Sequence, residues 1–65
     1  MDYGIALNSV IPLRAEPSHR AEMVTQLLFG ETFSVIDTAP GGWFRVRVAF
    51  DGYEGWMDAN QGFPI

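Results

Sequence analysis

Apolar and polar residues alternate most regularly in the second half of the chain. Every second residue of one stretch is apolar: Phe44, Val46, Val48 and Phe50. Arg45 and Arg47 stand between them. This period of two predicts a strand with one buried side and one side that faces solvent.

The residues after this strand predict a tight hairpin. Asp51 and Gly52 follow directly, and this dipeptide favours a two-residue type I′ turn, in which both central residues have positive φ. Tyr53–Met57 is then the returning strand. The hairpin predicts that Arg45 and Arg47 lie on a solvated face, paired with Glu54 or Asp58 across the two strands.

Further strands and loops are indicated elsewhere in the chain. The predicted strands outside the hairpin are Gly4–Ile11, Thr32–Asp37 and Phe63–Ile65. The first is expected to end at Pro12, because proline cannot donate a hydrogen bond within a sheet. Leu13–Arg20 is polar and contains Pro17, which predicts a long loop. Asp58–Gly62 predicts a single 3₁₀ turn before the last strand.

The segment Ala21–Phe29 fits two patterns. Ala21, Val24 and Leu28 recur at helical spacing, whereas Val24–Leu27 also fits a half-buried strand. The residues alone favour a helix and leave the strand open as the alternative.

The spacing of these elements predicts one small all-β domain that spans residues 1–65. About five short strands, with turn signals at intervals of about ten residues, are typical of a barrel or a small sandwich, and the small size favours the barrel. A chain of this length hides only about 60% of the surface that it exposes when unfolded. Its two tryptophans and five phenylalanines are therefore expected to supply much of the core.

Composition excludes several classes of function. The chain has no cysteine, so it contains no disulfide, thiolate metal site or cysteine nucleophile. The single histidine, His19, has no neighbour at metal-ligand spacing, and no metal or other cofactor is expected. The net charge of −4 disfavours a nucleic-acid partner. No stretch is long and apolar enough for a membrane span, and Met1–Gly4 shows no export signal, so a cytoplasmic location is expected, with the periplasm or cell envelope as the alternative.

Four short motifs resemble the bacterial SH3 (SH3b) pattern. In chain order they are Leu13–Ser18, Gly30–Val35, Gly42–Arg47 and Gly52–Met57, and the SH3b pattern to which they belong extends over nearly the whole chain. The resemblance implies an SH3-like barrel with a long first loop and a short 3₁₀ turn before the last strand. It also implies a strand at Val24–Leu28, in place of the helix that local spacing favours.

A narrower resemblance is to the amino-terminal SH3b module of NlpC-type cell-wall peptidases of Bacteroides-like bacteria. The matching segments are Tyr3–Ile5, Pro12–Ser18, Glu22–Glu31 and Asp51–Trp56. Members of that family cleave the bond between γ-D-glutamate and a diamino acid in peptidoglycan stem peptides, with a cysteine and histidines in a downstream domain. The resemblance therefore implies a module that is not itself an enzyme, with the stem peptide and the downstream peptidase domain as its partners.

The same resemblance supplies the candidate substrate-binding residues. In relatives, an acidic loop residue and a nearby tyrosine help to select peptides with a free L-alanine amino end. The resemblance implies these roles for Glu16 and Tyr53 here, with Tyr3 or Trp56 as alternatives to Tyr53. The alternatives for these residues are a solvated Glu16 paired with Arg14 or Arg20, and aromatic side chains that only pack.

Leu28 and Phe29 are candidates for an interface with the following domain. They belong to an apolar triplet, Leu27–Phe29, and in a strand at least one member of such a triplet must point away from the core. An exposed apolar patch often marks a partner surface. The alternative is that the triplet packs beneath the long loop of the same barrel.

Two other classes of function are a peptide adaptor and a complete catalytic domain. A peptide adaptor of the eukaryotic SH3 type grips Pro-rich segments with a proline and a tyrosine after the Gly-aromatic strand, and here Asp58 and Gln61 stand at those positions. A complete catalytic domain needs a nucleophile and a base held by a third group. Ser18 and His19 are only neighbours in a loop.

Overall fold

The computed structural model describes residues 3–64, and the chain folds into seven strands and one short 3₁₀ helix. In chain order the elements are β1 (Tyr3–Ala6), β2 (Val10–Arg14), β3 (Met23–Leu28), β4 (Thr32–Ala39), β5 (Trp43–Val48), β6 (Glu54–Asp58), η1 (Ala59–Gln61) and β7 (Gly62–Pro64). The structure does not describe Met1, Asp2 and Ile65. The last residue of the predicted strand Phe63–Ile65 therefore lies outside the described residues, as do the first two residues of Met1–Gly4.

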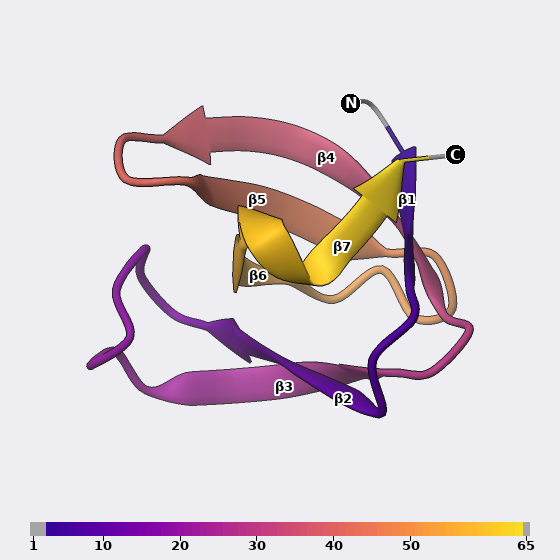
Figure 1. The fold of residues 1–65 in the computed structure, drawn as a ribbon. Coiled ribbons are helices and arrows are strands. Elements are labelled where there is room, and N and C mark those ends of the chain that lie inside the picture. The colour runs from indigo at the N-terminus through magenta and orange to yellow at the C-terminus, as the bar shows by residue number, and fades with distance from the viewer. Residues whose placement is uncertain (1–2, 65) are drawn as a thin grey trace.

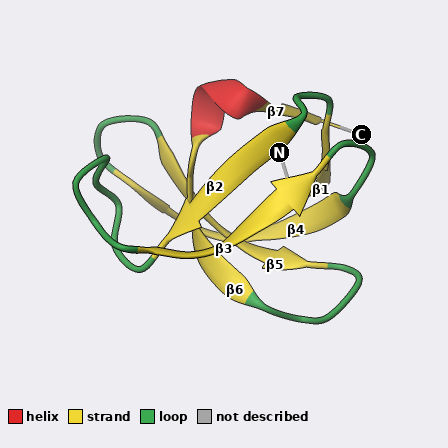
Figure 2. Cartoon of the chain, turned by 90° about the horizontal axis from the view of Figure 1, so that it is seen from below, coloured by secondary structure: helices red, strands yellow, loops and turns green. Residues whose placement is uncertain are grey.

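All strands belong to one antiparallel sheet that curves around a single core, as Figures 1 and 2 show. The strand order is β3-β2-β6-β5-β4-β1-β7, so β3 and β7 form the two edges. This arrangement confirms the predicted small all-β barrel, with a long β2–β3 loop and the 3₁₀ turn before the last strand, but with seven strands where about five were expected. The loop starts later than predicted, because Leu13 and Arg14 belong to β2 and Leu13 is buried in the core. The predicted first strand is divided into β1 and β2, which lie in different parts of the sheet.

The segment Ala21–Phe29, which fits both a helix and a strand by sequence, contains a strand. β3 (Met23–Leu28) pairs with β2 along its whole length, as the SH3b resemblance implies. The helix that local spacing favours is therefore wrong. Pairing with a distant segment overrides a pattern that is ambiguous by itself.

The prediction that a strand ends at Pro12 is also wrong, because Pro12 lies in the middle of β2, opposite Gln26 of β3. Leu28 donates its backbone N–H to Glu31 Oε1 at 2.7 Å, so this N–H points away from β2. Hydrogen-bonding direction alternates along a strand, and Gln26 therefore also directs its backbone groups away from β2. On its other side β2 pairs with β6 only at Arg14, so the missing N–H of Pro12 removes no sheet hydrogen bond.

The connection between β5 and β6 is longer than the predicted type I′ turn. Among the described residues only glycines have positive φ; Gly52 has φ 73°, and Asp51 does not share this conformation. Gly52 N–H donates to Val48 O at 2.8 Å, and Asp51 Oδ1 instead accepts from Tyr53 N–H at 2.9 Å. Since the strand ends at Val48, Phe50 lies in the loop and is 87% exposed, contrary to the buried position that the alternation predicts.

The core is more aliphatic than expected. Its buried cluster consists of Ala6, Ile11, Leu13, Leu27, Phe33, Val46, Val48 and Met57, with Val35 and Phe44 packed against it. Phe33 is its largest fully buried side chain. Phe29 and Phe50 are exposed, so these phenylalanines do not supply the core burial that composition suggests.

Candidate functional site

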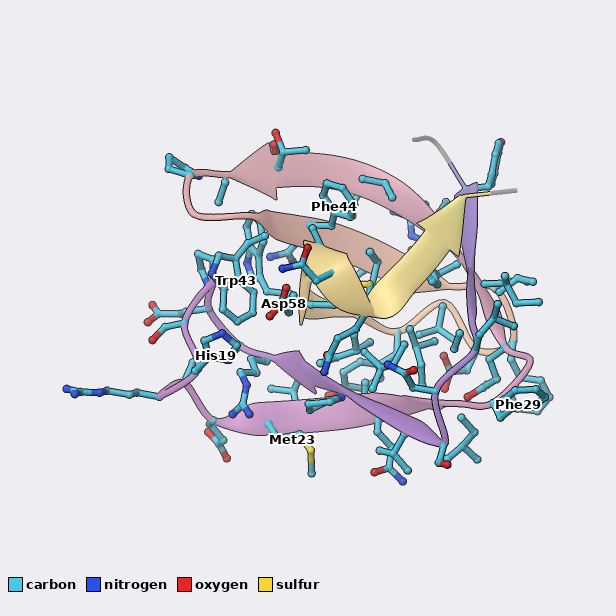
Figure 3. All side chains as sticks on the ribbon, in the orientation of Figure 1. His19, Met23, Phe29, Trp43, Phe44 and Asp58 are labelled. Carbon is cyan, nitrogen blue, oxygen red and sulfur yellow. The ribbon has the colours of Figure 1, made fainter. Side chains whose placement is uncertain are left out.

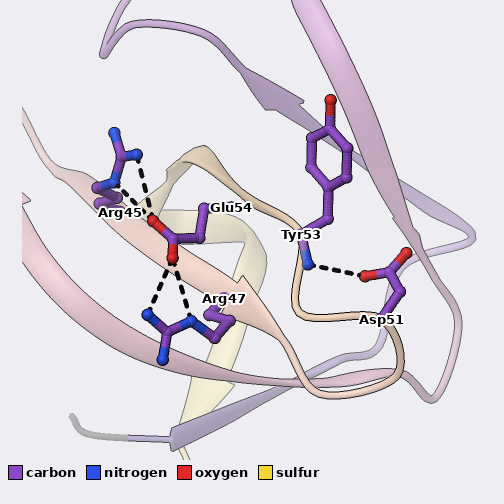
Figure 4. A network of polar contacts seen from close by, with 5 residues as sticks. All are labelled: Arg45, Arg47, Asp51, Tyr53 and Glu54. Carbon is purple, nitrogen blue, oxygen red and sulfur yellow. Dashed lines mark hydrogen bonds and ion pairs between the residues drawn. The ribbon is translucent and has the colours of Figure 1, made fainter.

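The outer face of β5 and β6 carries a charged cluster built around Glu54. Arg47 donates Nε and Nη2 to Glu54 Oε2 at 3.1 and 2.9 Å, and Arg45 donates the same two nitrogens to Oε1 at 3.4 and 3.2 Å. Figure 4 shows both guanidinium groups on one carboxylate. Hydrogen bonds from Arg47 and then Arg45 hold the pKa of Glu54 below its ordinary value. The predicted pairing across the hairpin is thus confirmed for Glu54.

Trp56 lies on the same face, between two arginines. In the sheet register it is opposite Arg45 of β5 on one side and opposite Arg14 of β2 on the other. The Arg45 guanidinium carbon is 5.9 Å from the centre of the Trp56 ring, within the range of a cation–π contact. Trp56 is half-buried, so part of its ring remains available to a ligand.

His19 closes one end of this face. Its ring centre is 4.7 Å from that of Trp43, and its Nε2 lies 3.6 Å from Asp58 Oδ2. Figure 3 shows the three side chains together at one end of the barrel. Trp43 is only 7% exposed although it belongs to the outer face, because the β2–β3 loop covers it. Local sequence patterns do not predict this cluster, because His19, Trp43 and Asp58 come from three separate segments. None of the three has another member of the cluster near it in the sequence.

The structure does not bring together the predicted residues Glu16 and Tyr53. Glu16 is exposed in the β2–β3 loop, at the end of the barrel where His19 meets Asp58. Tyr53 precedes β6 at its opposite end, is 49% exposed and points away from the Glu54 cluster in Figure 4. Within residues 3–64 no ion pair involves Glu16. Arg14, one of its suggested partners, instead donates to Ala21 O at 2.9 Å.

The predicted interface residues Leu28 and Phe29 are both exposed, at 49% and 67%. Val10, which pairs with Leu28 across the sheet, is also exposed, as is Leu7 in the preceding turn. Figure 3 places Phe29 at the opposite end of the barrel from His19. The alternative that Leu28 and Phe29 pack beneath the long loop is therefore wrong.

A separate apolar groove lies beside β1 and β4. It has a volume of about 430 Å³ and is lined by Tyr3, Thr32, Phe33, Ser34 and Ala49. None of these side chains is charged. The groove therefore offers no counter-charge for an ammonium group, and it is a weaker candidate than the β5–β6 face for binding a charged peptide.

The described residues show no arrangement typical of catalysis. Ser18 Oγ accepts the backbone N–H of Arg20 at 3.2 Å, whereas His19 faces Asp58. No group of three or more side chains able to hold a metal ion occurs in the described part of the chain. Among residues 3–64, no helix has the length and apolar character needed to cross a membrane.

Comparison with known families gives one match. A family model described as the bacterial dipeptidyl-peptidase Sh3 domain matches residues 13–61, well over half of the chain. The matched range runs from β2 to η1 and includes the whole β5–β6 face. Comparison with curated proteins gives no match.

Proposed function

Since this chain belongs to the bacterial dipeptidyl-peptidase SH3 domain family, we propose that it is the non-catalytic SH3b module of a cell-wall peptidase. In this proposal the module helps to position or select peptidoglycan stem peptides with a free L-alanine end. A Cys–His hydrolase domain, downstream in the same polypeptide, cleaves the bond between γ-D-glutamate and the diamino acid. The proposed role is substrate selection.

One observation carries the proposal beyond family membership. The β2–β3 loop holds the exposed Glu16, which forms no ion pair among residues 3–64, and the same loop contacts the barrel through His19, which meets Trp43 and Asp58. A carboxylate on an anchored loop can hold an ammonium group at a defined place. Tyr53 lies at the other end of β6, so half-buried Trp56 is the better candidate for the aromatic partner of Glu16.

Replacing Glu16 by glutamine is expected to remove selectivity for the free amine. A charge-assisted hydrogen bond contributes about 1.5–3 kcal/mol. We therefore expect the full-length enzyme to lose roughly tenfold or more of its preference for L-Ala-γ-D-Glu-diamino acid over the N-acetylated peptide. The measurement is kcat/KM on both peptides.

Glu22→Gln is a suitable control, because it removes the same charge from an exposed position at the other end of the loop. It should retain the selectivity. Equal preference of the Glu16→Gln enzyme and the unmodified enzyme for the free peptide would contradict the role of Glu16.

We further propose that the downstream peptidase domain docks on the exposed patch formed by Leu7, Val10, Leu28 and Phe29. Support comes from the exposure of these apolar side chains on adjacent elements. Attachment of the domain is expected to slow hydrogen exchange at Leu7 and Phe29, with the exposed loop around Phe50 as the control region. Unchanged exchange at the patch would contradict docking there.

A further inference from the structure

Arg45 and Arg47 each use only one edge of the guanidinium group on Glu54. Both donate through Nε and Nη2, and neither Nη1 takes part in these bonds. A guanidinium holds five N–H donors in one plane. Each arginine therefore keeps a second donor edge, and the two side chains are 39% and 53% exposed.

The charges around Glu54 are close to balance, although the whole chain is acidic. Arg45 and Arg47 carry two positive charges against the one negative charge of Glu54, which leaves an excess of one, whereas the chain has a net charge of −4. The lowered pKa of Glu54 keeps its carboxylate ionised near neutral pH. Asp37 lies opposite Arg45 in β4 and accepts the N–H of Thr38 at 2.8 Å. It forms no ion pair among the described residues, but its negative charge offsets the excess of one.

Trp56 adds an apolar surface directly beside these donors. It faces Arg45 in the register, with the guanidinium carbon 5.9 Å from the ring centre. A planar donor edge next to an aromatic ring suits a carboxylate carried on a short aliphatic chain. A site with free guanidinium donors but no large excess of positive charge suits a singly charged carboxylate better than a more highly charged phosphate.

We propose that Arg45, Arg47 and Trp56 form a carboxylate-binding subsite for the peptide substrate. The free donor edges of the arginines hold the carboxylate, and the adjoining methylene groups lie on Trp56. This inference rests on the proposed function, because a glutamate that is linked through its γ-carboxyl group keeps its α-carboxylate free. It adds recognition of a substrate carboxylate to the amine selection assigned to Glu16.

The test is an NMR titration of the ¹⁵N-labelled chain with the acid N-acetyl-D-glutamine, whose only carboxylate is the α-carboxylate, and with its α-amide, the corresponding diamide. The acid is expected to shift the side-chain N–H signals of Arg45, Arg47 and Trp56. The diamide should bind at least about tenfold more weakly, since it lacks the charge. Because the acid has no free amine, its binding does not depend on the role of Glu16.

Variants with opposite expected effects sharpen the test. Arg47→Gln should weaken binding of the acid by about tenfold. Glu54→Gln should strengthen it, because it removes the competing carboxylate. Arg20→Gln is the matched control, since it removes an exposed arginine of the β2–β3 loop and should leave the affinity unchanged. Well-dispersed amide spectra verify that each variant is folded.

Three results would overturn the subsite. They are equal affinity for the acid and the diamide, equal affinity in the Arg47→Gln and Arg20→Gln variants, and tighter binding of inorganic phosphate than of the acid. Each of these leaves the amine selectivity of the full-length enzyme intact, so failure of the subsite is distinguishable from failure of the proposed function.

Discussion

Replacement of Gly55 by alanine is expected to lower the free energy of unfolding by about 3 kcal/mol, at the upper end of the range for overpacking. An added Cβ would lie 2.8 Å from the Leu13 Cβ and 3.3 Å from the Val24 Cγ2. The first of these atoms is fixed to the backbone of β2, so the clash cannot be relieved by rotation of a side chain. A core of this size rarely supplies more than about 3–5 kcal/mol, and much of the variant should unfold.

Urea denaturation followed by tryptophan fluorescence measures this effect, with Gly52→Asn as the control. Gly52 has φ 73° and open space around it, and asparagine tolerates this backbone conformation better than other residues with a side chain. Its cost should stay within about 1 kcal/mol. A Gly55→Ala variant that unfolds at the same urea concentration as the unmodified domain would show that β2 and β6 do not approach as described.

Replacement of Phe33 by alanine is expected to cost about 3–5 kcal/mol and to abolish the fold at ambient temperature. Phe33 is only 1% exposed and is the largest fully buried side chain of the core. Its removal leaves a cavity that neighbouring strands cannot fill, since β4 is paired with β1 on one side and β5 on the other. Circular dichroism during heating is the measurement.

The matched control makes the same substitution at an exposed position. Phe50 is 87% exposed in the β5–β6 loop, so Phe50→Ala should change the free energy of unfolding by no more than about 0.5 kcal/mol. If the two alanine variants melted at similar temperatures, the assignment of Phe33 to the core would be wrong.

Local sequence patterns predicted the strands well where each has its own alternation. β4 and β5 are recognisable from their apolar positions, and the pairing of Arg45 and Arg47 with Glu54 follows from a hairpin whose strands are adjacent in the chain. The hairpin turn was predicted less well. The Asp51–Gly52 dipeptide is compatible with several loop lengths, and the hydrogen bond from Gly52 N–H to Val48 O selects a longer one.

Local sequence patterns did not predict the features that depend on contacts between distant segments. Only the family resemblance predicted β3, whose strand form depends on pairing with β2. The contacts of His19 with Trp43 and Asp58 require the long loop to fold back across β5 and β6. For the candidate site, the family resemblance named Glu16, Tyr53 and Trp56, and their roles remain predictions. Local patterns did not show that Glu16 and Tyr53 lie at opposite ends of the barrel, because this depends on where the β2–β3 loop folds.

Glu31 affects the edge of the sheet that β3 forms. Its carboxylate accepts the outward N–H of Leu28 at 2.7 Å, and its own N–H donates to Leu28 O at 3.0 Å. Unpaired backbone groups on an edge strand can recruit the strand of another molecule and start aggregation. By occupying both groups of Leu28 and placing a negative charge there, Glu31 shortens the stretch of β3 on which a second copy could add a strand. The apolar end of this edge is thereby protected against fibril-like growth while its side chains remain free for contact.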